Sequence, residues 1–113
     1  MNVISTAELQ ELKTKERDLV IINTLPREEF DKTNIPGAIS IPVDVPDFDD
    51  RVALAAGSKE NRLVVYCANE QCDCCDRAAK KLEAAGFTSV LTYKGGAEAW
   101  KNEAGLTRPA VSS

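Results

Sequence analysis

Three short apolar runs, separated by segments with helical patterning, place the strongest constraint on the fold of this chain. They lie at residues 19–23, 62–67 and 89–93 and are rich in β-branched residues. Continuous apolar runs of this length suit strands that are buried on both faces of a sheet. Strands that alternate with helices predict an α/β fold with a central, mostly parallel sheet flanked by helices on both faces.

The helical segments carry start and stop signals of their own. Ser5 followed by Glu8 is a capping box, and Gly57 and Gly86 stand where the left-handed residue at a helix end is expected. A turn at residues 36–37 precedes one more short strand. The expected helices lie at residues 4–13, 26–32, 45–57, 74–85 and 95–105.

The length and charge of the chain limit the number of its domains and the classes of its partners. A chain of 113 residues fits a single domain over residues 1–113, with a core at about residues 5–105 and a loose tail after it. The formal net charge of -4 disfavours nucleic acid or an anionic membrane as the main partner. With neither a long apolar window nor a signal-like start, we expect a cytoplasmic protein. The sequence is compatible with a monomer but does not fix the oligomeric state.

All four cysteines lie between Cys67 and Cys75, and the chain contains no histidine. The missing imidazole excludes Cys-His proteases, Ser-His-Asp hydrolases and His-ligated metal sites. A zinc site made only of cysteines is disfavoured because adjacent Cys74 and Cys75 cannot easily occupy two corners of a tetrahedron. We therefore expect no metal and no cofactor. In a reducing compartment we interpret Cys67 as a reactive thiol, whereas one or two of Cys72, Cys74 and Cys75 would only face the helix interior.

Cys67 ends the most convincing strand and directly precedes a loop and a helix start. Ligands of open parallel sheets bind beyond the carboxyl ends of the strands, so this thiol lies where chemistry is expected. A cysteine reacts as its thiolate. Because no histidine is present, the negative charge must be stabilised by the main-chain amides of the loop after Cys67 and by the positive end of the following helix. We therefore predict Cys67 as the nucleophile.

Five ordered motifs resemble those of the rhodanese homology domain: "EEF", "NIPGAISIP", "VVYC", "RAAKKLEAAGF" and "YKGGAEAW". The resemblance extends over nearly the whole chain. It implies that Cys67 accepts sulfane sulfur as a persulfide and passes it to a thiol acceptor. The donor would be a small sulfur compound or a persulfidated protein. The implied substrate-binding loop consists of Ala68, Asn69, Glu70, Gln71, Cys72 and Asp73.

Two other functions remain open at the level of sequence. The first is a thiol-redox protein in which Cys67 pairs with Cys72, or Cys72 with Cys75 in a C-x-x-C spacing. In the same chemistry Cys72 or Cys75 would act as the resolving thiol for an oxidised or persulfidated Cys67. The second is a non-catalytic binding module, a role that rhodanese-like domains also serve.

The loop departs from the common family pattern in length and in charge. It is longer than in common single-domain members and matches a branch with a second cysteine at Cys72. Glu70, Asp73 and Asp76 are acidic, and Arg77 is the first cation after Cys67. Carboxylates close to the thiol would oppose both thiolate formation and anion binding. Thiosulfate is therefore a doubtful preferred donor.

Three positions before Cys67 and one position in the loop after it also differ from the family pattern. Asn23 and Leu25 stand where many members have the Asp and Arg of a "DxR" motif, and Asn34 replaces the His of "HIPGA". These changes predict altered support of the site. Related phosphatases on this fold need an arginine at the position of Asp73, so phosphate-ester cleavage is excluded.

Overall fold

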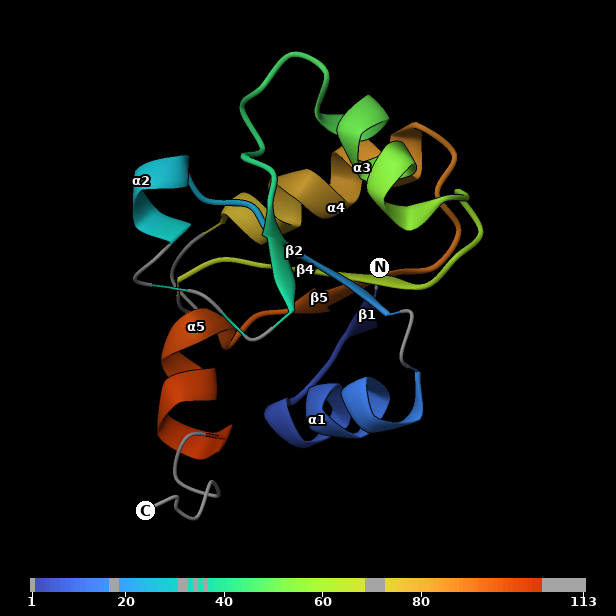
Figure 1. The fold of residues 1–113 in the computed structure, drawn as a ribbon. Helices are drawn as coiled ribbons and strands as arrows, with labels where there is room; N and C mark the ends of the chain where they lie inside the picture. The colour runs from blue at the N-terminus through green and yellow to red at the C-terminus, as the bar shows by residue number, and fades with distance from the viewer. Residues whose placement is uncertain are drawn as a thin grey trace.

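The computed structural model describes residues 2–16, 19–30, 33, 35, 37–68 and 73–104. Within these residues five strands form one sheet in the order β1-β5-β4-β2-β3, and every neighbouring pair is parallel (Figure 1). This confirms the predicted α/β architecture with its central parallel sheet. The strands are β1 (Asn2–Val3), β2 (Val20–Asn23), β3 (Ala38–Ser40), β4 (Leu63–Tyr66) and β5 (Val90–Tyr93).

The helices begin and end close to the predicted signals. Ser5 and Glu8 form the complete capping box of the first helix. Gly57 and Gly86 both have left-handed φ values, of 82° and 102°, which glycine adopts at little steric cost. The helices are α1 (Thr6–Lys15), α2 (Arg27–Phe30), α3 (Phe48–Ala56), α4 (Cys74–Ala84) and α5 (Gly96–Ala99), and α5 continues into a π-helical turn at Trp100–Ala104.

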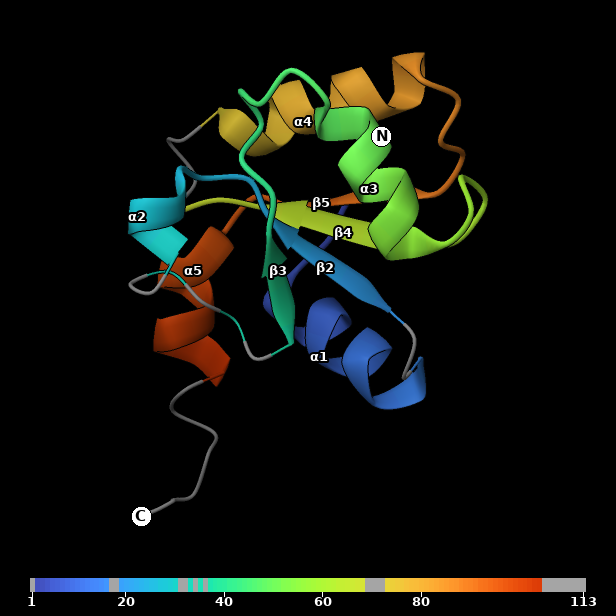
Figure 2. The ribbon, with the colours of Figure 1, turned by 45° about the horizontal axis from the view of Figure 1, so that its top comes forward.

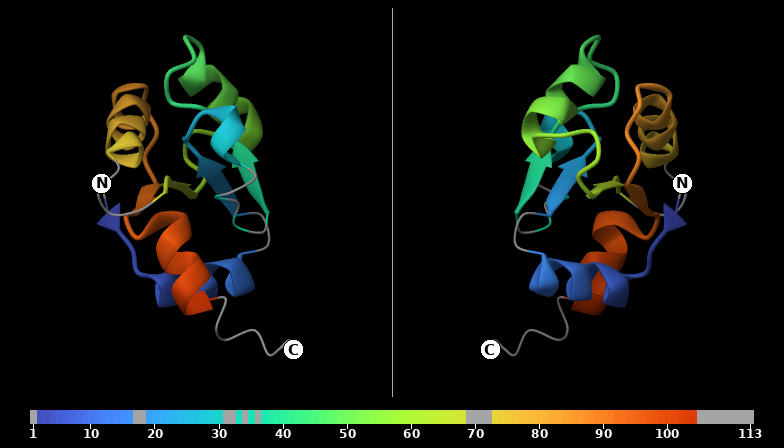
Figure 3. Two further views of the ribbon diagram at one scale, coloured as in Figure 1. Left: turned by 90° about the vertical axis from the view of Figure 1, so that its left-hand side faces the viewer. Right: turned by 90° about the vertical axis from the view of Figure 1, so that its right-hand side faces the viewer.

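The sheet separates two layers of helices, with α3 and α4 on one face and α1 and α5 on the other (Figures 2 and 3). Each face has its own apolar core. Alternate residues of β4 divide between the cores: Leu63 and Val65 belong to the α3/α4 core, and Val64 and Tyr66 to the α1/α5 core. Cys67, the next residue, belongs to the α3/α4 core. This alternation fixes the face of the sheet on which each residue after a strand can act.

The sequence predictions missed or displaced several boundaries. β1 was not predicted, because two residues at a sheet edge carry no readable periodicity. Strand β4 ends at Tyr66, so Cys67 is the first residue after the strand rather than its last one.

Trp100 packs against the α1/α5 core and is half-buried. Among the described residues, no helix combines the length and apolarity needed to cross a bilayer.

Candidate active site at the carboxyl edge of the sheet

Cys67 lies at the edge of the sheet where the carboxyl ends of β2, β4 and β5 meet. The main-chain N–H and the Oγ1 of Thr24, just after β2, both donate to the carbonyl of Tyr66 at 3.0 Å. From α5, the N–H of Ala97 donates to the carbonyl of Cys67 at 2.9 Å, and the N–H of Glu98 donates to that of Ala68 at 2.9 Å. The backbone on either side of the thiol is therefore held by two other elements.

The Cys67 side chain is fully buried in the α3/α4 core. Cys75, in the first turn of α4, is also fully buried and belongs to the same core. Cys75 therefore lies in the turn of α4 that presents the positive partial charge of the helix, and Cys67 shares its core.

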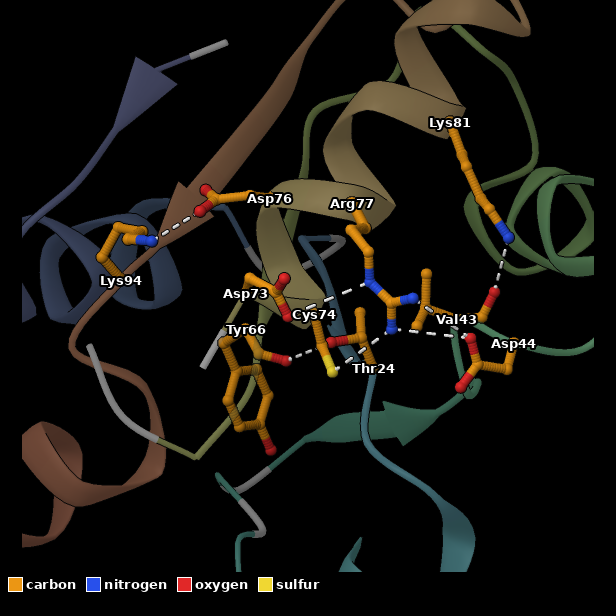
Figure 4. Close-up of polar contacts among 10 residues, drawn as sticks. All are labelled: Thr24, Val43, Asp44, Tyr66, Asp73, Cys74, Asp76, Arg77, Lys81 and Lys94. Carbon is orange, nitrogen blue, oxygen red and sulfur yellow. Dashed lines mark hydrogen bonds and ion pairs between the residues drawn. The ribbon is translucent and has the colours of Figure 1, made fainter. Parts of the chain in front are cut away.

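Cys74, also in the first turn of α4, packs against the same core but is only partly buried, and its sulfur lies beside Arg77 (Figure 4). The Nη2 of Arg77 lies 3.8 Å from its Sγ. Arg77 also lies 3.5 Å from a carboxylate oxygen of Asp44 and 4.0 Å from one of Asp73. The hydrogen bond to Cys74, followed by the charge of Asp44, raises the pKa of Arg77. Arg77 is therefore engaged with Cys74 and two carboxylates.

Lys94 is a cation at this edge that the sequence reasoning missed. It follows β5 directly, and its Nζ donates to Oδ2 of Asp76 at 2.6 Å, with both side chains about one-third exposed (Figure 4). The hydrogen bond to Asp76 raises the pKa of Lys94, and the charges of Cys75 and Cys67 act in the same direction. The feature that could have identified Lys94 is its position immediately after β5, a strand that pairs with β4.

The structure describes only part of the predicted loop. Cys67, Ala68 and Asp73 are described, whereas Asn69, Glu70, Gln71 and Cys72 lie outside the described residues, and the roles predicted for all of them stay predictions. Asp73 and Asp76 each lie against a cation. Their negative charges are thus partly neutralised, which weakens the electrostatic argument against thiosulfate.

The substitution at Asn23 is explained by a buried polar network. The Oδ1 of Asn23 accepts from the N–H of Leu25 at 3.0 Å, and its Nδ2 donates to the hydroxyl groups of Thr33 and Tyr66. Leu25 packs into the α3/α4 core instead of carrying a charge. The amide and the leucine therefore support this edge without the Asp and Arg of the "DxR" motif, while Asn34 lies outside the described residues.

Two negative findings delimit the site within the described part of the chain. It contains no group of three or more His, Cys, Asp or Glu side chains that could hold a metal ion. A groove of about 640 Å³ lies at the opposite edge of the sheet, between α1 and the start of β5, and does not include Cys67.

Comparisons with known proteins agree on the fold. A family model described as a rhodanese-like domain matches residues 5–103. The BH2092 protein from Bacillus halodurans superposes with a TM-score of 0.76 at 28% identity, over 91% of this chain and 73% of that one. A comparison with curated proteins gave no match.

Two structural neighbours are named for sulfur transfer. A thiosulfate sulfurtransferase from Pseudomonas aeruginosa has a TM-score of 0.75 at 25% identity, and the match covers 92% of this chain but 19% of that protein. The human single-domain sulfurtransferase TSTD1 has a TM-score of 0.74 over 91% of this chain and 97% of that one, and its 21% identity shows a shared fold alone.

Proposed function

Because this chain belongs to the rhodanese-like domain family, we propose that it is a sulfurtransferase in which Cys67 carries sulfane sulfur as a persulfide and passes it to a thiol acceptor. The observation that carries the proposal is that Cys67 directly follows β4 at the carboxyl edge of the parallel sheet and shares the α3/α4 core with Cys75 of the first turn of α4. The structural neighbour from Pseudomonas aeruginosa that is named thiosulfate sulfurtransferase supports the general role.

The proposed reaction has two displacement steps and no net oxidation. The Cys67 thiolate attacks the sulfane sulfur of the donor, so that a Cys67 S–S bond forms while the donor's own bond to that sulfur breaks. The leaving group departs with the bonding electron pair, as a thiolate from a persulfide or as sulfite from thiosulfate. A thiolate acceptor then attacks the outer sulfur, and Cys67 leaves again as its thiolate.

The protein's contribution in both steps is to stabilise an anionic sulfur. The sequence assigns this task to the main-chain amides of Ala68–Asp73 and to the first turn of α4, since no histidine can serve as a base. The hydrogen bonds from Ala97 and Glu98 to the carbonyls of Cys67 and Ala68 hold the start of that loop. A fixed start of the loop lets the amide of Ala68 act without reorganising during the reaction.

The donor proposed as preferred is a persulfide, either small or carried by a protein. Within Ala68–Asp73 the sequence supplies no basic side chain to hold a doubly charged anion. The acceptor would be a thiol in a reducing, cytoplasmic environment, and the proposal includes no cofactor, nucleic acid or membrane partner. Donor preference is measurable as the ratio of kcat/KM for glutathione persulfide and thiosulfate, which we expect to exceed one.

A single assay set separates sulfur transfer from the thiol-redox alternative. We expect thiocyanate formation from cyanide to persist in Cys72→Ser and Cys75→Ser, because neither thiol is needed to form or cleave the Cys67 persulfide. A redox mechanism predicts the opposite result, in which either substitution removes activity and the wild-type protein shows an intramolecular disulfide by mass spectrometry. If the folded protein shows no turnover with either donor, the result favours the non-catalytic binding module over an enzyme.

A further inference from the structure

Lys94 and Cys67 directly follow the paired ends of β5 and β4. Tyr66, the last residue of β4, is paired with Tyr93, the last residue of β5. Both tyrosines belong to the α1/α5 core, and side chains alternate between faces along a strand. Cys67 packs into the α3/α4 core and the Lys94 side chain reaches Asp76 of α4, so both side chains lie on the α3/α4 face.

Contacts with α4 confirm the direction of the Lys94 side chain. Its ammonium group is bound by Asp76, which follows the buried Cys75 in the first turn of α4. Lys94 thus bridges from the end of β5 to α4 across the same face that buries both thiols. Burial of Cys67 and Cys75 reduces the screening of a nearby charge by water.

We propose that Lys94, held in place by Asp76, is a positioning residue that favours the anionic form of the Cys67 sulfur. The proposal rests on the proposed role of Cys67 and names the cation that the loop sequence lacks. It also assigns opposite effects to the two members of the ion pair, since the ammonium stabilises the thiolate and the carboxylate opposes it. The influence of both thiols on the pKa of Lys94 agrees with this assignment, because electrostatic coupling is reciprocal.

Other charged and titratable groups near Cys67 also contribute to the electrostatic potential at its sulfur. Cys75 and Asp76 belong to α4, and α5 contributes Glu98, whose side chain is exposed. The residues after β2 that contact this edge, Thr24 and Leu25, are uncharged. Arg77 is directed toward Cys74 and Asp44 on the other side of α4, which makes it a matched control for the loss of one positive charge (Figure 4).

The test is a pH titration of the Cys67 thiolate by its ultraviolet absorbance. For each protein, the absorbance of the same protein with the added substitution Cys67→Ser is subtracted, which leaves the contribution of Cys67. This readout needs neither a sulfur donor nor access of a reagent to the buried thiol. We expect Lys94→Met to raise the midpoint by about one pH unit and Asp76→Asn to lower it by about half a unit. Lys94→Arg should restore the wild-type midpoint, and Arg77→Met should leave it within about 0.2 units.

Equal titration midpoints in the wild type, Lys94→Met and Asp76→Asn would overturn the proposal. It would also be overturned if Lys94→Met and Arg77→Met raised the midpoint equally. Circular dichroism establishes that each variant is folded, and Asp76→Asn, which removes no packing, tests the charge effect if Lys94→Met does not fold. A normal titration response combined with no sulfur transfer would instead contradict the proposed function while leaving the role of Lys94 intact.

Discussion

Cys67→Ser is expected to lower the rate of sulfur transfer by at least about 10³-fold, to the level of the uncatalysed reaction. Serine has nearly the shape of cysteine, but its oxygen cannot form the S–S bond on which the proposed reaction depends. The measurement is thiocyanate formation from cyanide with glutathione persulfide or thiosulfate as donor. Cys74→Ser is the matched control, because Cys74 is only partly buried and its sulfur lies beside Arg77, and it should keep most of the activity.

A folded protein is needed to interpret that loss. Placing a hydroxyl group in the apolar α3/α4 core costs about 1–3 kcal/mol if it finds no partner. Cys67→Ala avoids this cost and should be equally inactive. Transfer activity that survives in both Cys67 variants would show that another thiol carries the sulfur.

Tyr66→Phe is expected to lower the free energy of unfolding by about 2 kcal/mol. The fully buried hydroxyl accepts from the N–H of Ile35 and the Nδ2 of Asn23, each at 3.0 Å, and donates to the carbonyl of Thr33 at 2.8 Å. Phenylalanine fills almost the same space but leaves the buried N–H of Ile35 without its acceptor. Urea unfolding measures the effect, and an unchanged free energy would show that the hydroxyl network is not stabilising.

The same residue makes stability depend on pH in the alkaline range. Burial raises the pKa of Tyr66, and the hydrogen bonds from Ile35 and Asn23 oppose this in part. An unfolded tyrosine ionises near pH 10, so above about pH 10 the unfolded state releases a proton that the folded state keeps. This contribution to stability is therefore complete below that pH and falls as the pH rises. The stability difference between wild type and Tyr66→Phe should narrow accordingly.

The elements that could be predicted from the sequence are those with a strong local signal. The β-branched runs of β2, β4 and β5 identified buried parallel strands, and the capping box at Ser5 and the glycines at Gly57 and Gly86 marked helix ends. The place of Cys67 followed from the same reasoning, because the end of a central parallel strand is fixed once the strands are known.

Features that depend on pairing between distant segments could not be predicted in this way. β1 is two residues long and is defined only by its pairing with β5. The contact of Lys94 with Asp76 depends on the register of β5 against β4 and on the position of α4. For the same reason, the sequence did not show that Asp76 and Asp73 each have a cationic partner, which offsets part of the opposing charge predicted for them.

Peptide mapping by mass spectrometry after incubation with a stoichiometric sulfane-sulfur donor identifies the thiol that carries the sulfur. Peptides containing Cys67 and those containing the other three cysteines are resolved after blocking free thiols, and cyanide treatment is applied to a parallel sample. The account predicts one added sulfur atom on Cys67 that cyanide removes as thiocyanate. An unmodified Cys67 in a protein that transfers sulfur, with the added sulfur on Cys72, Cys74 or Cys75 instead, would contradict it.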